Sequence, residues 1–283
     1  MTEKHSFSPH SERITCIYTD KEYLYTGSRD RTIKIWDKNT FQDIATLRGH
    51  RHFIARICTD DTSIYSGSAD SKIKIWDKNT FQEKASIKEE NPIDSIYIDQ
   101  DNIYCASHNS TFRVLNKDTF QEIKKFKAHC DTLFVDDDNI FTMSVRGVVV
   151  WNKKYKKVAM IKEKGSFLDG VFFSGIYADE DNLYLGFSPT GIFRVYDRNT
   201  YKKTKSIEKH ASKIMDIYGD EKYIYTASMD KTVIVWDKKT LELKTTLSGH
   251  ADTISDVCTD DINIYTASWD NTIKIWNKKS LDI

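Results

Sequence analysis

The 283-residue sequence lacks the features that mark redox, metal or membrane chemistry. Its cysteines stand singly, without a C-x-x-C pair and in odd number, so their spacing encodes neither a disulfide framework nor a zinc site. No stretch approaches the roughly 18 apolar residues of a membrane span, and the N-terminus lacks the apolar core of a signal peptide. We therefore expect a reducing, cytoplasmic location without membrane insertion. The cysteines are Cys16, Cys58, Cys105, Cys130 and Cys258.

An excess of charge of one sign is also missing, because 42 basic and 42 acidic residues cancel. A chain without a net positive field does not collect nucleic acid or anionic membrane over its whole surface, so no nucleic-acid partner is expected. The glycine-rich loops that cradle phosphates in P-loop and dinucleotide-binding proteins are absent as well. We expect no cofactor and no resident metal.

What the sequence does have is an internal repeat, seen best in the stretch from Ile264 to Asn277. An apolar residue followed by an aromatic one opens each copy, and successive copies are 37 to 43 residues apart. A nearly constant period of this length indicates a repeat architecture, so we predict a single domain over residues 1–283, monomeric in isolation. The pairs are Leu24-Tyr25, Ile64-Tyr65, Ile103-Tyr104, Ile140-Phe141, Leu183-Tyr184, Ile224-Tyr225 and Ile264-Tyr265.

Each copy contains short runs of alternating apolar and polar residues, separated by turns rich in Asp, Asn, Ser and Gly. The run from Lys72 to Trp76 shows this period of two, and no segment shows a sustained helical period. We therefore expect three or four strands per copy. Sheets this small bury both faces only by stacking radially. We predict an all-β fold, a seven-bladed β-propeller with four-stranded antiparallel blades.

The repeat resembles the WD-repeat β-propeller family, whose marks are a Gly-His pair and a later Trp-Asp pair. Gly49-His50 precedes Trp76-Asp77, and Gly249-His250 precedes Trp276-Asn277. The interval from His to Trp is 26 residues in the first, second, sixth and seventh copies.

The resemblance implies a buried hydrogen-bond chain of His, Ser or Thr, Asp and Trp in each regular blade. Ser28 and its equivalents have the same strand parity as the expected hydroxyl residues and remain alternatives. We interpret these sets as polar core networks rather than hydrolase triads, because four equivalent sets accompany a buried Trp. The sets are His10, Thr26, Asp30, Trp36; His50, Ser66, Asp70, Trp76; His210, Thr226, Asp230, Trp236; and His250, Thr266, Asp270, Trp276.

The middle copies depart from the pattern, so their blades are expected to be less regular. The third has Asn109 for Asp and Leu115 for Trp. The fourth keeps His129 and Trp151 but is one residue short, and the fifth has Tyr196 for Trp and no aligned His.

The seventh copy ends before its outer strand. Residues 2–7 fall where that strand belongs, which predicts that the N-terminal segment pairs with the Trp276 strand and closes the ring. A frayed edge, or a chain cut from a longer protein, is the alternative.

Acidic turns and lysine clusters also recur in the copies. The turn from Asp136 to Asn139 has calcium-binding residue types, but it lacks the Gly and Glu of a helix-loop-helix calcium site, and turn formation explains it better. The lysines from Lys153 to Lys157 could contact phosphate, but the acidic turns on the same face are expected to offset their field.

The opposite face carries variable residues. In the WD-repeat family, the turns with the Ser-x-Asp element crowd around the narrow end of the channel, where partners commonly dock. Here x is Arg29, Ala69, His108, Met229 and Trp269, with Pro189 in the fifth copy. The family also exposes the third and fifth residues after the His: Arg13, Thr15, Phe53, Ala55, Thr132, Phe134, Lys213, Met215, Thr253 and Ser255.

The fifth copy adds a long apolar loop over residues 165–173. Exposure is expected for Phe167 and Phe172, whereas Phe173 could equally fill space inside the fold.

These observations favour a non-catalytic scaffold that binds a peptide or protein on the narrow face. Aromatic and Arg residues are enriched among interface hot spots. The alternatives are an enzyme with a site in the channel, and a sensor or targeting module of a larger protein. The predicted partner-binding residues are Trp269, Arg29, Phe53, Phe134, Phe172, Met229, Met215, His108, Arg13 and Lys213.

Overall fold

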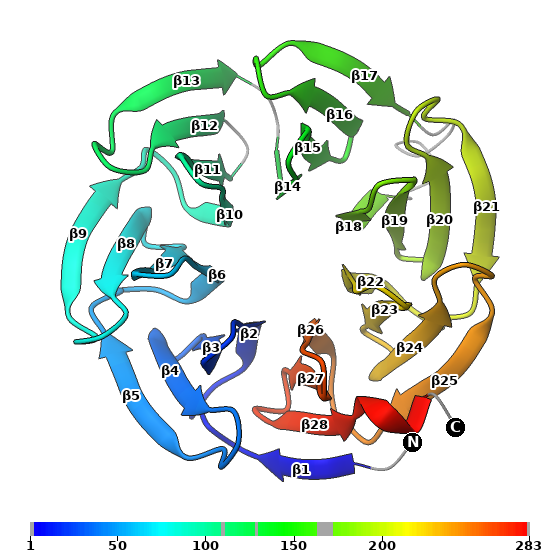
Figure 1. The fold of residues 1–283 in the computed structure, drawn as a ribbon, viewed down its shortest axis with the longest axis horizontal. Coiled ribbons are helices and arrows are strands. Elements are labelled where there is room, and N and C mark those ends of the chain that lie inside the picture. The colour runs from blue at the N-terminus through cyan, green and yellow to red at the C-terminus, as the bar shows by residue number, and fades with distance from the viewer. Residues whose placement is uncertain (1–2, 109–110, 128–129, 163–171, 282–283) are drawn as a thin grey trace. The chain divides into compact units, whose positions relative to one another are not determined.

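The computed structural model describes residues 3–108, 111–127, 130–162 and 172–281, and these are mostly β-strand (Figure 1). The chain divides into two compact units, one made of Met1–Glu22 with Gly165–Ile283 and the other of Tyr23–Lys164. Within the described ranges the only helical element is the short 3-10 helix η1 (Lys278–Leu281).

The first unit contains η1 and the strands β1 (Glu3–Phe7), β2 (Ile14–Thr19), β18 (Phe172–Ala178), β19 (Asn182–Ser188), β20 (Ile192–Asp197), β21 (Lys203–Glu208), β22 (Ile214–Gly219), β23 (Tyr223–Ser228), β24 (Thr232–Asp237), β25 (Leu243–Ser248), β26 (Ile254–Thr259), β27 (Asn263–Ser268) and β28 (Ile273–Asn277). The second unit contains β3 (Tyr23–Ser28), β4 (Thr32–Asp37), β5 (Asp43–Arg48), β6 (Ile54–Thr59), β7 (Ser63–Ser68), β8 (Lys72–Asp77), β9 (Glu83–Lys88), β10 (Ile93–Ile98), β11 (Asn102–Ser107), β12 (Thr111–Asn116), β13 (Glu122–Lys127), β14 (Thr132–Val135), β15 (Asn139–Ser144), β16 (Gly147–Asn152) and β17 (Lys157–Ile161).

The described strands form seven four-stranded sheets, which we call blades 1 to 7 in chain order. This confirms the predicted β-propeller fold class. The sheet orders are β2-β3-β4-β5, β6-β7-β8-β9, β10-β11-β12-β13, β14-β15-β16-β17, β18-β19-β20-β21, β22-β23-β24-β25 and β1-β28-β27-β26.

The core lies between blades, because a single sheet has two apolar faces to cover. Every residue of the second strands β7, β23 and β27 is buried, whereas the outer strands β9 and β21 are mostly exposed. Phe193 of blade 5 stacks on Trp236 of blade 6, with ring centroids 5.7 Å apart. Tyr104 and Phe112 of blade 3 likewise share a cluster with Leu133 of blade 4. Each blade therefore depends on its neighbour for burial.

The N-terminal strand supplies the outer strand of blade 7, as predicted. β1 pairs antiparallel with β28, with Glu3 opposite Trp276 and Phe7 opposite Ile273 (Figure 1). The Lys274 ammonium also forms an ion pair with the Glu3 carboxylate at 2.5 Å. The polar composition of β1 fits this place, since outer strands keep one face in water.

A repeated lysine clamp joins neighbouring blades at the ends that carry the acidic turns. In blades 3, 6 and 7, the lysine after the Trp-Asp, Trp-Asn or Leu-Asn pair contacts two turns at once. Lys238 of blade 6 donates to the Asp220 carbonyl of its own blade at 3.0 Å and pairs with the Asp179 carboxylate of blade 5 at 3.1 Å. The same ion pair between neighbours links Lys117 to Asp60, Lys153 to Asp99 and Lys278 to Asp220.

The acidic turns therefore have a structural role in the clamp. The Asp220 carboxylate accepts the Tyr223 and Lys222 amides at 2.8 Å each and the Tyr225 hydroxyl at 2.7 Å. Burial acts to raise the pKa of Asp220, but the hydrogen bonds from Lys278, Tyr225 and the turn amides outweigh it and lower the pKa. A solvated-loop interpretation of these turns is incomplete.

Deletion of residues 1–8 is expected to lower the Tm by several degrees, because blade 7 then loses its outer strand. In a domain of this size about 1 kcal/mol corresponds to a shift of about 2 to 4 °C. Differential scanning calorimetry measures the effect. Deletion of residues 1–2, which precede β1, is the control, and an unchanged Tm for the longer deletion would contradict the role of β1.

Lys238→Met is expected to lower the free energy of unfolding by about 1 kcal/mol, because it removes the clamp contacts on Asp179 and on the Asp220 carbonyl. Lys239→Met changes the adjacent, exposed lysine and should stay within about 0.5 kcal/mol of the parent. Urea unfolding of both variants tests this. Equal destabilisation by the two would show that the clamp contributes nothing specific.

Candidate functional site

The side chains of His50, Asp70, Ser66 and Trp76 form a continuous hydrogen-bond chain in blade 2. His50 Nδ1 lies 2.9 Å from Asp70 Oδ2, and His50 Nε2 lies 2.8 Å from Ser66 Oγ. Trp76 Nε1 donates to the same Ser66 oxygen at 2.9 Å. Because a carboxylate only accepts, Nδ1 carries the proton, and Ser66 donates its hydroxyl proton to Nε2 of the neutral ring.

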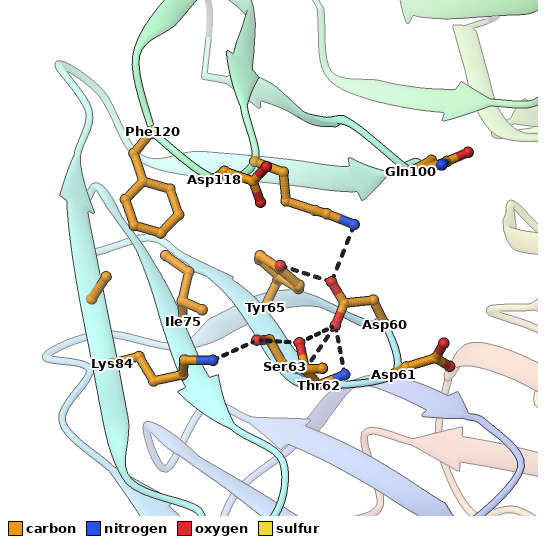
Figure 2. Close-up of a pocket in the computed structure, with 12 residues that line it drawn as sticks. Asp60, Asp61, Thr62, Ser63, Tyr65, Ile75, Lys84, Gln100, Asp118 and Phe120 are labelled. Carbon is orange, nitrogen blue, oxygen red and sulfur yellow. Dashed lines mark hydrogen bonds and ion pairs between the residues drawn. The ribbon is translucent and has the colours of Figure 1, made fainter.

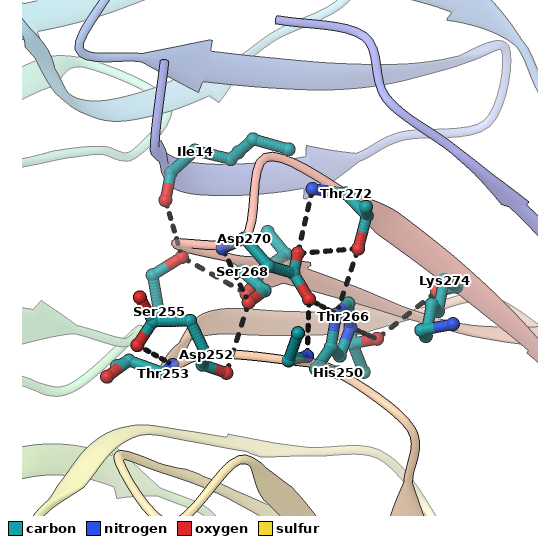
Figure 3. A network of polar contacts seen from close by, with 12 residues as sticks. Ile14, His250, Asp252, Thr253, Ser255, Thr266, Ser268, Asp270, Thr272 and Lys274 are labelled. Atoms are coloured by element: carbon teal, nitrogen blue, oxygen red, sulfur yellow. Dashed lines mark hydrogen bonds and ion pairs between the residues drawn. The ribbon is translucent and has the colours of Figure 1, made fainter.

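Blades 6 and 7 contain the same chain. In blade 7, His250 lies 3.0 Å from Asp270 and 2.8 Å from Thr266 (Figure 3). Trp276 donates to Thr266 at 3.1 Å. In blade 6, the corresponding distances from His210 to Asp230, from His210 to Thr226 and from Trp236 to Thr226 are 2.8, 2.8 and 3.0 Å.

The other hydroxyl residue of the same strand, Ser28 and its equivalents, was the alternative partner for the indole. It makes different hydrogen bonds. Ser228 donates to the backbone carbonyls of Ser212 and Lys213 at 3.1 and 3.0 Å and accepts the Asp230 amide. It therefore fixes the turn and not the indole.

In blades 1 and 4 the indole of the Trp bonds to the strand hydroxyl, as in blade 2. Trp36 donates to Thr26 at 3.1 Å, and Trp151 donates to Thr142 at 2.9 Å. Asp30 accepts the Thr32 amide and hydroxyl. His10 belongs to the other unit, and Asn109 and His129 lie outside the described residues.

Blade 3 replaces the chain with a buried ion pair that the sequence patterns did not reveal. Glu89, 3% exposed, stands where other blades have His, and its Oε1 lies 2.6 Å from Arg113 Nη1. Arg113 also pairs with Glu122 at 2.8 Å, while Leu115 fills the Trp position. Spacing to Ile93 could have identified Glu89, because His50 precedes Ile54 by the same interval.

Burial lowers the pKa of the His50 imidazole, and this outweighs the opposite effect of Asp70. The pKa of Asp70 is lowered as well: burial acts to raise it, but the hydrogen bonds from the Arg51 amide and from His50 prevail. Blade 2 therefore holds a neutral ring against an ionised carboxylate near neutral pH.

Backbone hydrogen bonds bring together the two kinds of variable position. The amide of the x residue in Ser-x-Asp donates to the carbonyl of the third residue after the His or its equivalent. We call this end of a blade the docking end. The donor and acceptor pairs are Ala69 to Phe53 at 3.1 Å, His108 to Pro92 at 2.8 Å, Met229 to Lys213 at 2.9 Å and Trp269 to Thr253 at 2.9 Å.

In the first unit, the docking end holds the predicted residue Trp269 beside Arg13. The Arg13 guanidinium carbon lies 4.6 Å from the centroid of the Trp269 ring, within cation–π range. Met229 is 37% exposed, and Lys213 and Met215 are half-buried. The predicted exposure of Thr253 and Ser255 is wrong, because they are 3% and 8% exposed.

In the second unit, Arg29 lies over Phe53, with its guanidinium carbon 5.7 Å from the ring centroid. His108 is exposed, and its Nδ1 lies 3.0 Å from the Asp94 carboxylate. Burial raises the pKa of Asp94, and His108 opposes this only in part.

The structure corrects the placement of Phe134. It pairs with Phe141 in the ladder, where Tyr97 pairs with Tyr104 in blade 3, and its ring lies 5.4 Å from that of Tyr97. β14 has four residues where β6, β22 and β26 have six, and the connection before it is one residue shorter than theirs, so counting from His129 gives a shifted register. Phe134 therefore packs along the inner strands instead of at the docking end.

The fifth-copy loop is only partly described. Phe172 begins β18, and Phe167 lies outside the described residues. Phe173 is 8% exposed and its ring lies 4.9 Å from that of Phe187, so it fills space inside the fold.

A cavity of about 570 Å³ opens between blades 2 and 3, beside the lysine clamp (Figure 2). Ser63 stands there in the place that Tyr23 and Tyr223 take in their own ladders, opposite the Asp after the Trp. The smaller side chain leaves room next to Phe120, and Lys84 donates to Ser63 at 3.2 Å. Sequence reasoning did not predict this pocket.

The described residues hold no group of three or more His, Cys, Asp or Glu side chains placed for a metal ion. Within the same ranges, no helix has the length and apolarity needed to cross a membrane.

His50→Gln is expected to lessen the loss of stability as the pH falls from about 7 towards about 5. The unfolded imidazole takes up a proton near its ordinary pKa of about 6.5, whereas the buried ring resists protonation, so acid favours unfolding. Asp70 contributes outside this window, since its stabilisation is lost only below its ordinary pKa. Urea unfolding across the pH range compares the two proteins. Parallel curves would contradict a neutral buried His50.

Short segments of known proteins are similar in sequence to this chain. Zinc finger CCCH domain-containing protein 59 of Arabidopsis thaliana is 51% identical over 41 residues, 14% of this chain and 9% of that protein. Coatomer subunit beta'-2 of Arabidopsis thaliana is 42% identical over 50 residues, 16% of this chain and 5% of that protein. The matched part thus spans less than one tenth of either relative.

The crystal structure of the computationally designed Ika8 protein superimposes with a TM-score of 0.76 at 19% identity, covering 97% of this chain and 99% of the designed one. This shows a likeness of fold. The family model described as WD domain, G-beta repeat matches residues 1–37, 41–77, 201–237 and 241–277, more than half of the sequence. The chain therefore belongs to the WD domain, G-beta repeat family.

Proposed function

We propose that this protein is a non-catalytic scaffold that binds a peptide or protein segment at the docking ends of its blades. Membership of the WD domain, G-beta repeat family supports a role in protein interaction. Similarity to a coatomer subunit, a component of an assembly by its name, is in keeping with this role.

The observation that carries the proposal is a constant backbone with variable side chains. The amide of the x residue makes the same hydrogen bond in blades 2, 3, 6 and 7, although x is Ala69, His108, Met229 or Trp269. Packing and hydrogen bonding at this position therefore do not select the side chain. Residues that a fold leaves undetermined are available for recognition of a partner.

The chemistry of these side chains suits protein recognition. Trp269 is half-buried beside Arg13, and Phe53 lies under Arg29, so each unit presents an aromatic ring with a guanidinium. Such rings lose little conformational entropy on binding, because contacts already hold them. We propose Trp269 as an anchor in the first unit and Phe53 with Arg29 in the second.

Trp269→Ala is expected to weaken partner binding by about 2 kcal/mol or more, roughly thirtyfold in affinity, and to shift the Tm by only a few degrees. A quantitative pull-down with wild type, Trp269→Ala and Arg29→Glu identifies partners that depend on these residues, and titration calorimetry then measures the loss. Ile262→Ala removes a 48% exposed apolar side chain from an acidic turn and serves as the control. Binding that survives in Trp269→Ala would remove Trp269 from the site.

A further inference from the structure

Arginine is concentrated in one part of the chain. The sequence has ten arginines, and six of them lie between residues 13 and 56. Five of the six belong to the unit of Tyr23–Lys164, and four of these five are exposed. We call Arg29, Arg31, Arg48 and Arg51 the arginine cluster.

The ladder of blade 1 places two members of the cluster side by side. Arg48 ends β5 directly opposite Thr32 of β4, and Arg31 immediately precedes Thr32. Neighbouring strands bring such positions to the same end of the sheet. Arg31 and Arg48 are therefore neighbouring residues at one end of blade 1.

The other two members meet at the connection into blade 2. The Arg29 guanidinium lies over the Phe53 ring, which packs against His52 with ring centroids 5.0 Å apart. Arg51 directly precedes His52, and its amide donates to Asp70 in the turn of blade 2 at 2.7 Å. Arg29 and Arg51 thus lie next to an aromatic pair at the docking ends of blades 1 and 2, the ends to which Arg31 and Arg48 also belong.

The fold itself leaves this positive charge uncompensated. No carboxylate in the described ranges forms an ion pair with any of the four guanidinium groups. The nearby carboxylates are engaged elsewhere, since Asp30 accepts the Thr32 amide and hydroxyl and Asp70 accepts from His50. Arg113 shows the contrasting arrangement, because Glu89 and Glu122 both pair with it.

We propose that the arginine cluster binds an acidic peptide segment whose Asp or Glu side chains pair with the guanidinium groups, while an apolar side chain packs against Phe53. Guanidinium forks match carboxylates in two parallel hydrogen bonds, which lysine cannot reproduce. The proposal rests on the proposed scaffold function and names the chemistry of the partner in this unit.

The size of the cluster favours a peptide over nucleic acid. Specific duplex binding commonly neutralises about six to ten phosphates, whereas the cluster offers four cations at the ends of two blades. The protein also has no net charge. An aromatic pair within the cluster provides an apolar contact that a short acidic segment can use.

The test is fluorescence anisotropy with the intact chain and a short labelled peptide rich in glutamate with one central leucine. Binding is expected to weaken about tenfold or more in Arg48→Glu/Arg51→Glu, and also when salt is raised from about 0.05 to about 0.5 M. Lys154→Glu/Lys156→Glu is the matched control, because it makes the same charge change at exposed lysines in the β16–β17 turn of the same unit. The control should bind like wild type.

Several outcomes would overturn the proposal. These are equal binding of a peptide with glutamine for glutamate, an equal loss in the lysine control, or tight binding of a phosphoserine peptide, an RNA oligonucleotide or anionic vesicles in place of the glutamate peptide. A partner that depends on Trp269 but is indifferent to Arg48→Glu/Arg51→Glu would overturn the arginine cluster and leave the scaffold function standing.

Discussion

Burial between blades is the constraint on which the rest of the structure depends. A four-stranded sheet with apolar residues on both faces is stable only when neighbours cover them, and the buried second strands show how completely this occurs. The contact of Phe193 with Trp236 is one example, in which blade 5 packs against blade 6. Polar groups that must lie in this core need partners inside it, because water does not reach them.

The hydrogen-bond chain of the core and the lysine clamp both follow from this constraint. In the core, the chain from Trp76 through Ser66 and His50 to Asp70 pairs an indole, a hydroxyl and an imidazole that burial would otherwise leave unsatisfied. At the acidic turns, Lys238 lies between two blades and bonds to both. Blade 3 shows that the core chain is one solution among others, since the Glu89 and Arg113 pair occupies the same place.

The features that repeat along the chain could be predicted from the sequence. Features of a copy that deviates from the repeat could not. Period-two alternation and constant spacing gave the strands, the blades and the place of β1, because these depend on local pattern. The register of Phe134 could not be obtained by counting, since β14 and the connection before it are both shorter than in the regular blades and only the ladder shows the shift. The clamp was missed because its lysine and aspartate come from different copies, and only the packing of blades brings Lys117 to Asp60.

The division between lysine and arginine follows the same logic. A clamp must reach a carbonyl in one blade and a carboxylate in the next, and the ammonium of Lys278 does this with donors pointing in several directions, bonding Asp260 and Asp220. The planar fork of arginine is better suited to one flat partner. Where that partner lies within the protein, as for Arg113, carboxylates of the fold pair with the guanidinium charge. Exposed guanidinium groups without such a partner contribute little to the stability of the blades, so the fold does not explain their concentration at the docking ends of blades 1 and 2.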